Sequence, residues 1–349
     1  MRSFVPGYVC VLIAAGLAVA PALAAETDHT GWYLEVEGAS ATPGNVNTPL
    51  LVSQAPLFGA GPFENETIFS DFDSSVAYRI GFGYSWGKKG RLQVTYWSYS
   101  DETSTSAFVP AYGGTGSNYN WFTIGPIAAW GAGYYGTNYY DTTIDIEQEI
   151  EASTIDVEFR RPVTMGSENM TVEWGIGMRI ASFEDEVRGN YFVDYSTGYN
   201  FPVSRQVDSD GIGFTASLGV EYLFPSKVLG MSSNLRVGFL TSDIDASHSA
   251  IDQDGYYATA GAIVRESSSS EDEVANTIDF DANILFHAGD HLEFDVGWFF
   301  TTWSDLAQVS LSRGQGLSGT SFIQAPDLGD DNRDRISWSG PRARVRFRF

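Results

Sequence analysis

The C-terminus places the strongest constraint on what this chain can fold into. Residues 342–349 alternate four arginines with four apolar residues, and the chain stops on Phe349. Successive side chains of a β-strand point to opposite faces, so this segment has one cationic face and one apolar face. In water such a strand invites aggregation, whereas the last strand of a transmembrane barrel meets lipid on one face and a polar interior on the other. A half-buried strand of a soluble sheet is the alternative.

The same alternation recurs along the chain, which favours the barrel over the soluble sheet. Ten stretches show it: 32–40, 76–86, 92–96, 143–163, 172–180, 212–222, 235–239, 278–287, 292–300 and 342–349. Long segments at 44–74, 104–142, 187–208, 246–272 and 306–334 alternate with short turns. The pattern predicts an all-β fold, a transmembrane antiparallel up-and-down β-barrel with long external loops and short periplasmic turns. About ten strands are expected, with eight or twelve as alternatives.

The first residues have the pattern of a secretory signal. Arg2 is followed by an apolar stretch at 9–20 and by a small-x-small cleavage site at 22–24. We therefore predict a signal peptide at 1–24 and an outer-membrane β-barrel domain at 25–349. The single cysteine, Cys10, would leave with the signal, so no disulfide framework is expected. No later segment approaches 18 consecutive apolar residues, the length from which a spanning helix is inferred. Export without a helical anchor leaves a soluble, a surface-bound or a barrel protein as the outcome. The alternating strand faces and the terminal Phe349 predict the bacterial outer membrane as the destination.

Charge and aromatic content narrow the partners. The formal net charge of -24 argues against nucleic acid. Aromatic residues make up 14% of the chain, and tyrosine and tryptophan are typical of membrane–water interfaces. The expected partners are outer-membrane lipid, lipopolysaccharide and small polar solutes. No cofactor is expected.

The faces opposite the apolar rows carry both signs of charge. The predicted lumen-lining acids are Glu35, Glu37, Asp156, Glu158, Glu173, Glu221, Asp279, Asp281, Glu293 and Asp295. The predicted lumen-lining bases are Arg79, Arg160, Arg179, Arg236, Arg342, Arg344, Arg346 and Arg348. Buried ions are costly unless they are paired, so we expect an interior laced with ion pairs. A ten-stranded lumen is narrow, and it is either plugged by this network or a slender polar channel.

Barrel closure predicts one specific set of pairs. The final strand must pair with the first, and both present charge to the interior. Glu35 and Glu37 should therefore lie across from the arginine row at 342–348, with Glu293 and Asp295 on its other side.

Catalytic and metal-binding patterns are weak. His248 follows Asp243 and Asp245 near the external rim, where ten-stranded proteases of the omptin type use Asp and His. The spacing of three between Asp245 and His248 departs from that type, so a polar loop is the interpretation and no catalytic residue is predicted. The acids of the last loop have oxygen ligands suited to calcium; they are Asp327, Asp330, Asp331 and Asp334. A solvated acidic loop is expected there, without a metal.

Two resemblances refine these expectations. The terminal Phe347 and Phe349 resemble the C-terminal β-signal of bacterial outer-membrane proteins, which implies recognition by the barrel-assembly machinery. Several segments resemble the pore-forming outer-membrane proteins typified by the Legionella major outer-membrane protein. These segments are 79–84, 156–161, 175–180, 211–213 and 218–220. That family is cysteine-rich and cross-linked, which does not carry over to a mature chain without cysteine.

The resemblance implies a porin-like pore for small polar solutes in a Gram-negative cell envelope. The alternative is a non-conducting structural or adhesive surface barrel with a charge-plugged lumen, displaying the aromatic loop at 104–142.

Overall fold

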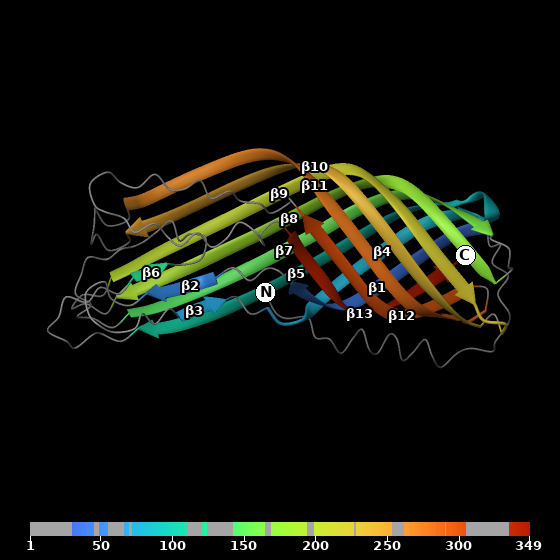
Figure 1. The fold of residues 1–349 in the computed structure, drawn as a ribbon, viewed down its shortest axis with the longest axis horizontal. Coiled ribbons are helices and arrows are strands. Elements are labelled where there is room, and N and C mark those ends of the chain that lie inside the picture. Colours follow the sequence, from blue (N-terminus) through green and yellow to red (C-terminus); the bar gives the residue numbers. More distant parts are fainter. Residues whose placement is uncertain are drawn as a thin grey trace.

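Ten strands form a closed antiparallel barrel in the computed structural model (Figure 1). The structure describes residues 30–44, 49–54, 66–69, 72–109, 121–123, 142–164, 169–193, 199–226, 228–252, 262–289, 291–304 and 335–349. The barrel strands are β1 (Thr30–Gly44), β4 (Ser75–Trp86), β5 (Arg91–Val109), β7 (Thr142–Thr164), β8 (Met170–Val193), β9 (Tyr199–Leu223), β10 (Leu229–Asp252), β11 (Ala262–His287), β12 (Leu292–Ser304) and β13 (Arg335–Arg348). Strand β13 pairs back onto β1, so the predicted fold class and strand count are confirmed. The predicted signal peptide and cleavage site lie outside the described residues.

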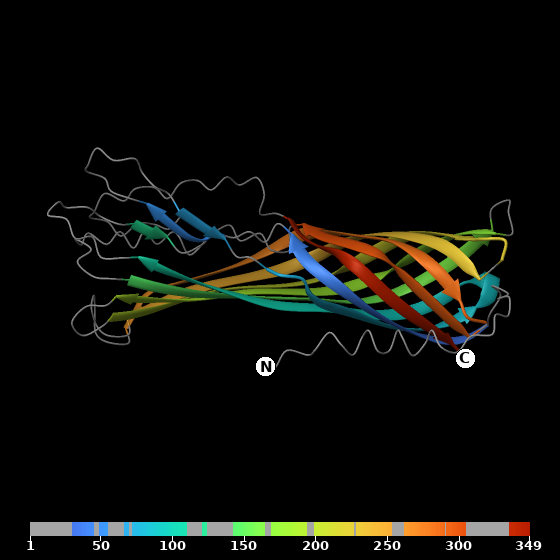
Figure 2. The ribbon, with the colours of Figure 1, turned by 90° about the horizontal axis from the view of Figure 1, so that it is seen from below.

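Six of the strands run on past the rim of the barrel (Figure 2). Pairing of β4 with β5 ends at Tyr78–Ser98, whereas β5 stays paired with β7 as far as Val109. Pairing of β11 with β12 ends at Asn276–Ser304, whereas β10 and β11 continue to Asp252–Ala262. We call this six-stranded extension the projecting wall. It comprises 99–109, 142–153, 182–193, 199–210, 241–252 and 262–275.

The projecting wall corrects part of the predicted loop map. Strands β8, β9, β10 and β11 occupy most of the segments expected to be loops at 187–208 and 246–272, and β5 extends into the one expected at 104–142 as far as Val109. The apolar alternation marks where a strand meets lipid, and it ends where the strand leaves the membrane although the backbone pairing continues. Two predicted loops also contain a small sheet of order β3-β2-β6, made of β2 (Pro49–Gln54), β3 (Glu66–Phe69) and β6 (Trp121–Thr123). The predicted loop at 306–334 lies outside the described residues.

Short turns join the strands at the opposite end, which we call the turn end; the end with the projecting wall is the loop end. A 3₁₀ turn, η1 (Gly87–Lys89), links β4 to β5, with φ of 62° at Gly87 and 129° at Gly90. Gly289, with φ of 78°, lies between β11 and β12. Positive φ favours glycine, so these turns are encoded locally. In the described part of the chain, no helix combines the length and the apolar character needed to span a membrane.

The outer surface of the barrel is apolar. Large side chains that face outward include Phe214 at 73% exposed and Phe239 at 62%. At the turn end, aromatic rings contact one another edge to face on this surface, with centroid distances of 5.0 Å for Trp32–Tyr84 and 5.2 Å for Tyr84–Trp86. An apolar band edged by aromatic rings is the outer surface that transmembrane barrels present to lipid.

The closing seam between β1 and β13 brings two backbones unusually close. The hydrogen-bonded ladder pairs Ala39 with Arg342 and Thr42 with Ser339, and it is interrupted between them, where Pro341 has no amide hydrogen to donate. A Cβ on Gly340 would lie 1.7 Å from the Ser40 carbonyl oxygen, which leaves room for glycine alone.

The close approach of the two backbones at Gly340 leads to a testable prediction. Gly340→Ala should lower the free energy of unfolding by about 1–3 kcal/mol, because an added methyl group forces the seam apart. Gly219→Ala is the matched control, since its Cβ would have its nearest neighbour, Asn234 Oδ1, at 3.6 Å. The measurement is the temperature at which the folded gel band converts to the unfolded one. Equal midpoints for the two variants would contradict the prediction.

Candidate functional site

The interior of the barrel gathers the charged side chains. The structure places the predicted lumen residues on the interior face: Glu35, Glu37, Arg79, Asp156, Glu158, Arg160, Glu173, Arg179, Glu221, Arg236, Asp279, Asp281, Glu293, Asp295, Arg342, Arg344, Arg346 and Arg348. Arg91, which the sequence analysis did not select, joins them through a 2.7 Å contact with Glu173. The alternation that turns Leu92 outward was the signal that could have found it.

The seam is an acid–base–acid arrangement across three strands. In register, Arg346 of β13 lies between Glu35 of β1 and Glu293 of β12. Its guanidinium contacts Glu35 at 3.0 Å and Glu293 at 2.7 Å, and Arg348 also binds Glu293. One guanidinium therefore ties the first strand of the barrel to the two last ones.

Further along β13, the arrangement repeats toward the loop end. Arg342 contacts Glu37 of β1 at 2.7 Å and Asp281 of β11 at 3.1 Å. Arg344 donates to Asp295 of β12 at 2.6 Å. The arginine row of the last strand is thus compensated on both sides, as buried ions require.

A second cluster crosses the lumen away from the seam. Asp156 lies between Arg179 at 2.7 Å and Arg236 at 2.9 Å. Arg236 also contacts Glu158 at 2.9 Å, and Arg179 contacts Asp279 at 2.5 Å. No residue of the cluster is more than 9% exposed. The pairs therefore link β7, β8, β10 and β11 in an environment that excludes most water.

Small residues make room for the long side chains. A Cβ on Gly81 would lie 2.5 Å from the Glu35 side chain, and one on Gly175 would lie 2.6 Å from a Glu158 carboxylate oxygen. The inward glycines of the alternating pattern therefore create the space that the ion pairs fill.

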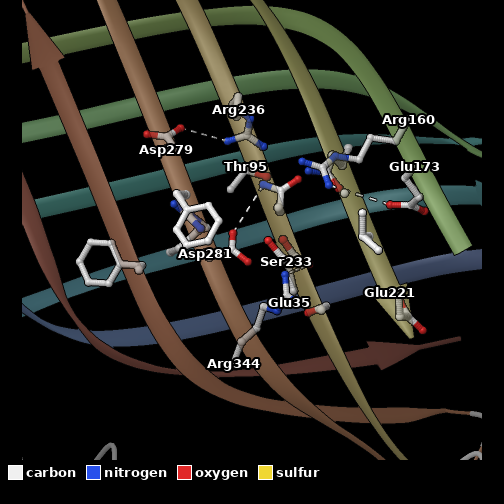
Figure 3. A pocket seen from close by; sticks show the side chains of 18 of the residues that line it. Glu35, Thr95, Arg160, Glu173, Glu221, Ser233, Arg236, Asp279, Asp281 and Arg344 are labelled. Atoms are coloured by element: carbon white, nitrogen blue, oxygen red, sulfur yellow. Dashed lines mark hydrogen bonds and ion pairs between the residues drawn. The ribbon is translucent and has the colours of Figure 1, made fainter. Parts of the chain in front are cut away.

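A cavity of about 90 Å³ remains within the charged layer (Figure 3). Its lining includes Arg79, Arg91, Thr95, Asn234 and Arg236, each of which has a buried polar atom without a protein hydrogen-bond partner. A polar cavity of that size accommodates a few water molecules, because one water needs about 10–15 Å³ on the same measure. The space is far smaller than an open channel.

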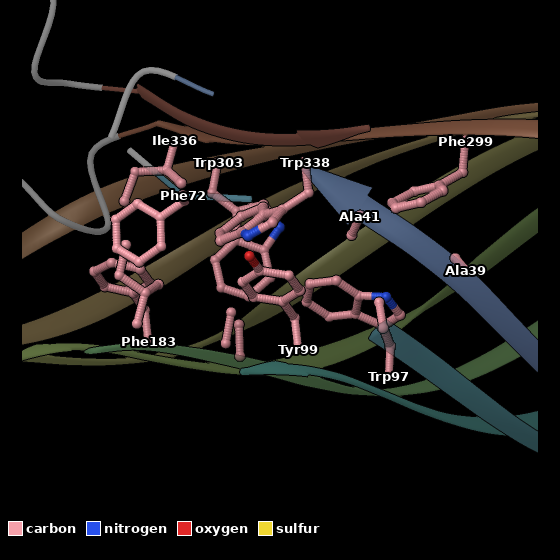
Figure 4. Packing of buried hydrophobic residues seen from close by; sticks show 14 of the residues in the cluster. Ala39, Ala41, Phe72, Trp97, Tyr99, Phe183, Phe299, Trp303, Ile336 and Trp338 are labelled. Carbon is pink, nitrogen blue, oxygen red and sulfur yellow. The ribbon is translucent and has the colours of Figure 1, made fainter. Parts of the chain in front are cut away.

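An aromatic layer closes the lumen where the projecting wall leaves the barrel (Figure 4). The rings of Trp303, Trp97 and Tyr99 surround Trp338, with centroid distances of 5.1, 5.8 and 5.9 Å. All four side chains are at most 4% exposed. This layer was not predicted from the sequence, although the alternation that turns Arg342 inward also turns Trp338 inward.

The residues considered for catalysis are not assembled into a site. Asp243 and Asp245 are exposed and alternate with the buried Ile244, so they face outward from β10. The His248 side chain and the four aspartates of the last loop lie outside what the structure describes. Within the described ranges, no group of His, Cys, Asp or Glu side chains is arranged to hold a metal ion.

The outer face of the projecting wall is acidic. Outward residues change from Ile180 and Ile212, each 51% exposed, to Ser182 and Asp210 in the next pair. The outward acids of the wall are Glu102, Asp145, Glu147, Glu149, Glu151, Glu184, Glu186, Asp208, Asp210, Asp243, Asp245 and Asp272. A sharp change from apolar to acidic marks the level at which the outer surface leaves lipid for water.

Crowding of these acids shifts their titration. Partial burial and the charges of Asp208, Glu151 and Glu186 raise the pKa of Glu184. A hydrogen bond with Glu102, and the charge of that carboxylate, raise the pKa of Glu147. Like charges facing one another across strands destabilise a sheet.

Comparisons with known proteins return distant structural likenesses. No family model matches the chain, and no curated protein matches it. The outer membrane protease OmpT from Escherichia coli is 8% identical, with a TM-score of 0.43, over 94% of this chain and 99% of that one. OprG from Pseudomonas aeruginosa is 11% identical, with a TM-score of 0.30, over 93% and 99%. The toluene transporter TbuX from Ralstonia pickettii is 7% identical, with a TM-score of 0.24, over 92% and 90%. The resemblance to the Legionella family stays a prediction.

The seam predicts how charge reversal acts. Glu35→Arg with Glu37→Arg should lower the free energy of unfolding by at least about 3 kcal/mol, because two buried pairs become buried repulsions. Glu35→Gln with Glu37→Gln should cost less, because Arg346 keeps Glu293 and Arg342 keeps Asp281. The thermal midpoint of the gel-mobility shift measures both variants. A reversed-charge protein as stable as the parent would contradict closure along this seam.

The acidic wall predicts a pH dependence. Carboxylates whose pKa is raised by folding bind protons more tightly in the folded state, so their repulsion weakens and stability rises as pH falls through the raised pKa. The thermal midpoint should therefore increase as the pH is lowered from 8 toward 4.5, the ordinary pKa of a glutamate, and Glu147→Gln with Glu184→Gln should reduce that increase. Asp243→Asn is the control, because Asp243 is an outward acid of β10 and is not among the charges that raise the pKa of Glu147 or of Glu184. An unchanged pH dependence in the double variant would refute the argument.

Proposed function

We propose that this chain is an outer-membrane β-barrel with a closed lumen, acting at the cell surface as a structural or adhesive protein. The observation that carries the proposal is the double closure of the lumen. An ion-paired layer fills the half toward the turn end, and the layer around Trp338 seals the half toward the loop end. A narrow barrel filled in this way offers its outer surface for interaction but no route for solutes through its lumen.

The proposed setting is the bacterial outer membrane. The apolar outer band supports a lipid environment, with the turn end in the periplasm and the projecting wall outside the cell. Export through a signal peptide at 1–24, recognition of Phe347 and Phe349 by the barrel-assembly machinery, and contact with lipopolysaccharide belong to the same proposal.

A pore for small polar solutes is the second candidate. The polar cavity favours it, because its lining already offers unpartnered hydrogen-bonding atoms of Arg79, Arg91 and Arg236. Such a pore requires the aromatic layer to move aside. A catalytic role is not part of the proposal, since Asp243 and Asp245 face away from the interior.

Single-channel recording in planar bilayers tests the proposal. The parent should show no sustained conductance steps, because both layers block the lumen. Trp303→Ala with Trp338→Ala should conduct measurably more, since it removes the rings that seal the loop end. Trp298→Ala is the matched control, because this tryptophan is 55% exposed on the lipid face. Sustained steps from the parent would overturn the closed barrel in favour of the pore.

A further inference from the structure

The charges of the lumen do not balance. The described interior of the barrel has nine arginines: Arg79, Arg91, Arg160, Arg179, Arg236, Arg342, Arg344, Arg346 and Arg348. Nine carboxylates have an arginine nitrogen within ion-pair distance: Glu35, Glu37, Asp156, Glu158, Glu173, Asp279, Asp281, Glu293 and Asp295. Glu221 is the tenth carboxylate, and its ion-pair partner among the described residues is His287.

His287 is buried in an unusual setting. It is the last residue of β11 and is 2% exposed, and its backbone amide donates to the Val228 carbonyl at the turn end. Its Nε2 lies 3.9 Å from a Glu221 oxygen, and its Nδ1 lies 3.8 Å from a Glu293 oxygen. Neither ring nitrogen has a hydrogen-bond partner. Buried polar groups nearly always have a hydrogen-bond partner. Each nitrogen of this ring lacks one, although each faces a carboxylate oxygen just beyond hydrogen-bond distance.

The other charged groups near the pair are already engaged. Glu293 of β12 is held by Arg346 and Arg348 of β13. Glu173 of β8, which lines the cavity together with Glu221, is held by Arg91. Glu221 therefore carries the uncompensated charge of the lumen, and its side chain is 33% exposed, so solvent ions reach it.

We propose that Glu221 and His287 together form a binding site for one proton. With that proton on the imidazole, the ring becomes a cation between Glu221 and Glu293, and ten positive groups face ten carboxylates. Both ring nitrogens are then donors, and each faces a carboxylate oxygen. The bound proton links the ends of β9, β11 and β12, which makes the turn end of the barrel responsive to the pH of the compartment that it faces. The inference goes beyond the proposed function, because it holds whether or not the lumen conducts.

Carbon-13 NMR of the histidine rings tests this inference on the full mature protein in detergent micelles. His287→Gln identifies the signal of His287 by its loss. The ring should take up one proton as the pH is lowered. In Glu221→Gln its midpoint should move down by about 1–3 pH units, since an opposite charge at this distance favours the protonated ring by that amount. Glu151→Gln, on the outer wall, is the control and should leave the midpoint unchanged.

Stability separates proton binding from a purely structural role. At pH 8, Glu221→Gln should melt no lower than the parent, because it removes an uncompensated charge. Glu37→Gln should melt lower than the parent, because it leaves Arg342 and Arg79 without one of their carboxylate partners. A His287 midpoint that is the same in the parent and in Glu221→Gln overturns the proposal. The proposal is also overturned if His287→Gln leaves the pH dependence of melting unchanged while exchanging sodium for bulky organic cations at constant ionic strength shifts the melting of the parent. A small cation would then occupy the site in place of the proton.

Discussion

The arginine row of β13 is the interaction on which the rest of the barrel depends. A sheet closes only if its last strand satisfies its first, and here the interior face of that strand is entirely cationic over residues 342–348. Arg346 is shared between Glu35 and Glu293, so the same guanidinium compensates charge and joins the chain ends. A buried charge that lacks its partner is strongly destabilising. The neighbouring strands must therefore present acids at positions that match the arginines. This requirement fixes the register of the seam.

The two faces of each barrel strand meet different environments, and this difference explains how much of the fold could be predicted from the sequence. Lipid on one face and ion pairs on the other impose strict alternation, which made the ten strands and the charges at Glu35 and Glu37 predictable. The projecting wall was not predictable in the same way, because outward residues such as Ser182 and Asp210 meet water, where polar strand and polar loop look alike. The small β3-β2-β6 sheet is too short to show a period.

The closed lumen was harder to foresee than its charges. Alternation predicts that Trp97, Trp303 and Trp338 point inward, but it does not say that residues from three strands meet at one level. That depends on the tilt and stagger of the barrel, which bring β5, β12 and β13 together around Trp338. The same holds for Asp156, Arg179 and Arg236, whose signs were readable from the sequence and whose partners across the lumen were not.

The two layers that close the lumen are held together by different interactions, and this difference decides which layer rearranges more easily. In the charged layer Arg236 is shared by two carboxylates, so displacing it would leave Asp156 and Glu158 less compensated in a buried interior. The aromatic layer is held by ring packing, and the indole N–H groups of Trp303 and Trp338 have no hydrogen-bond partner. Ring contacts are worth only about 0.5–1.5 kcal/mol each beyond their burial, so rearrangement costs least at this layer. Opening of the lumen would therefore begin at the loop end, where the barrel gives way to the projecting wall.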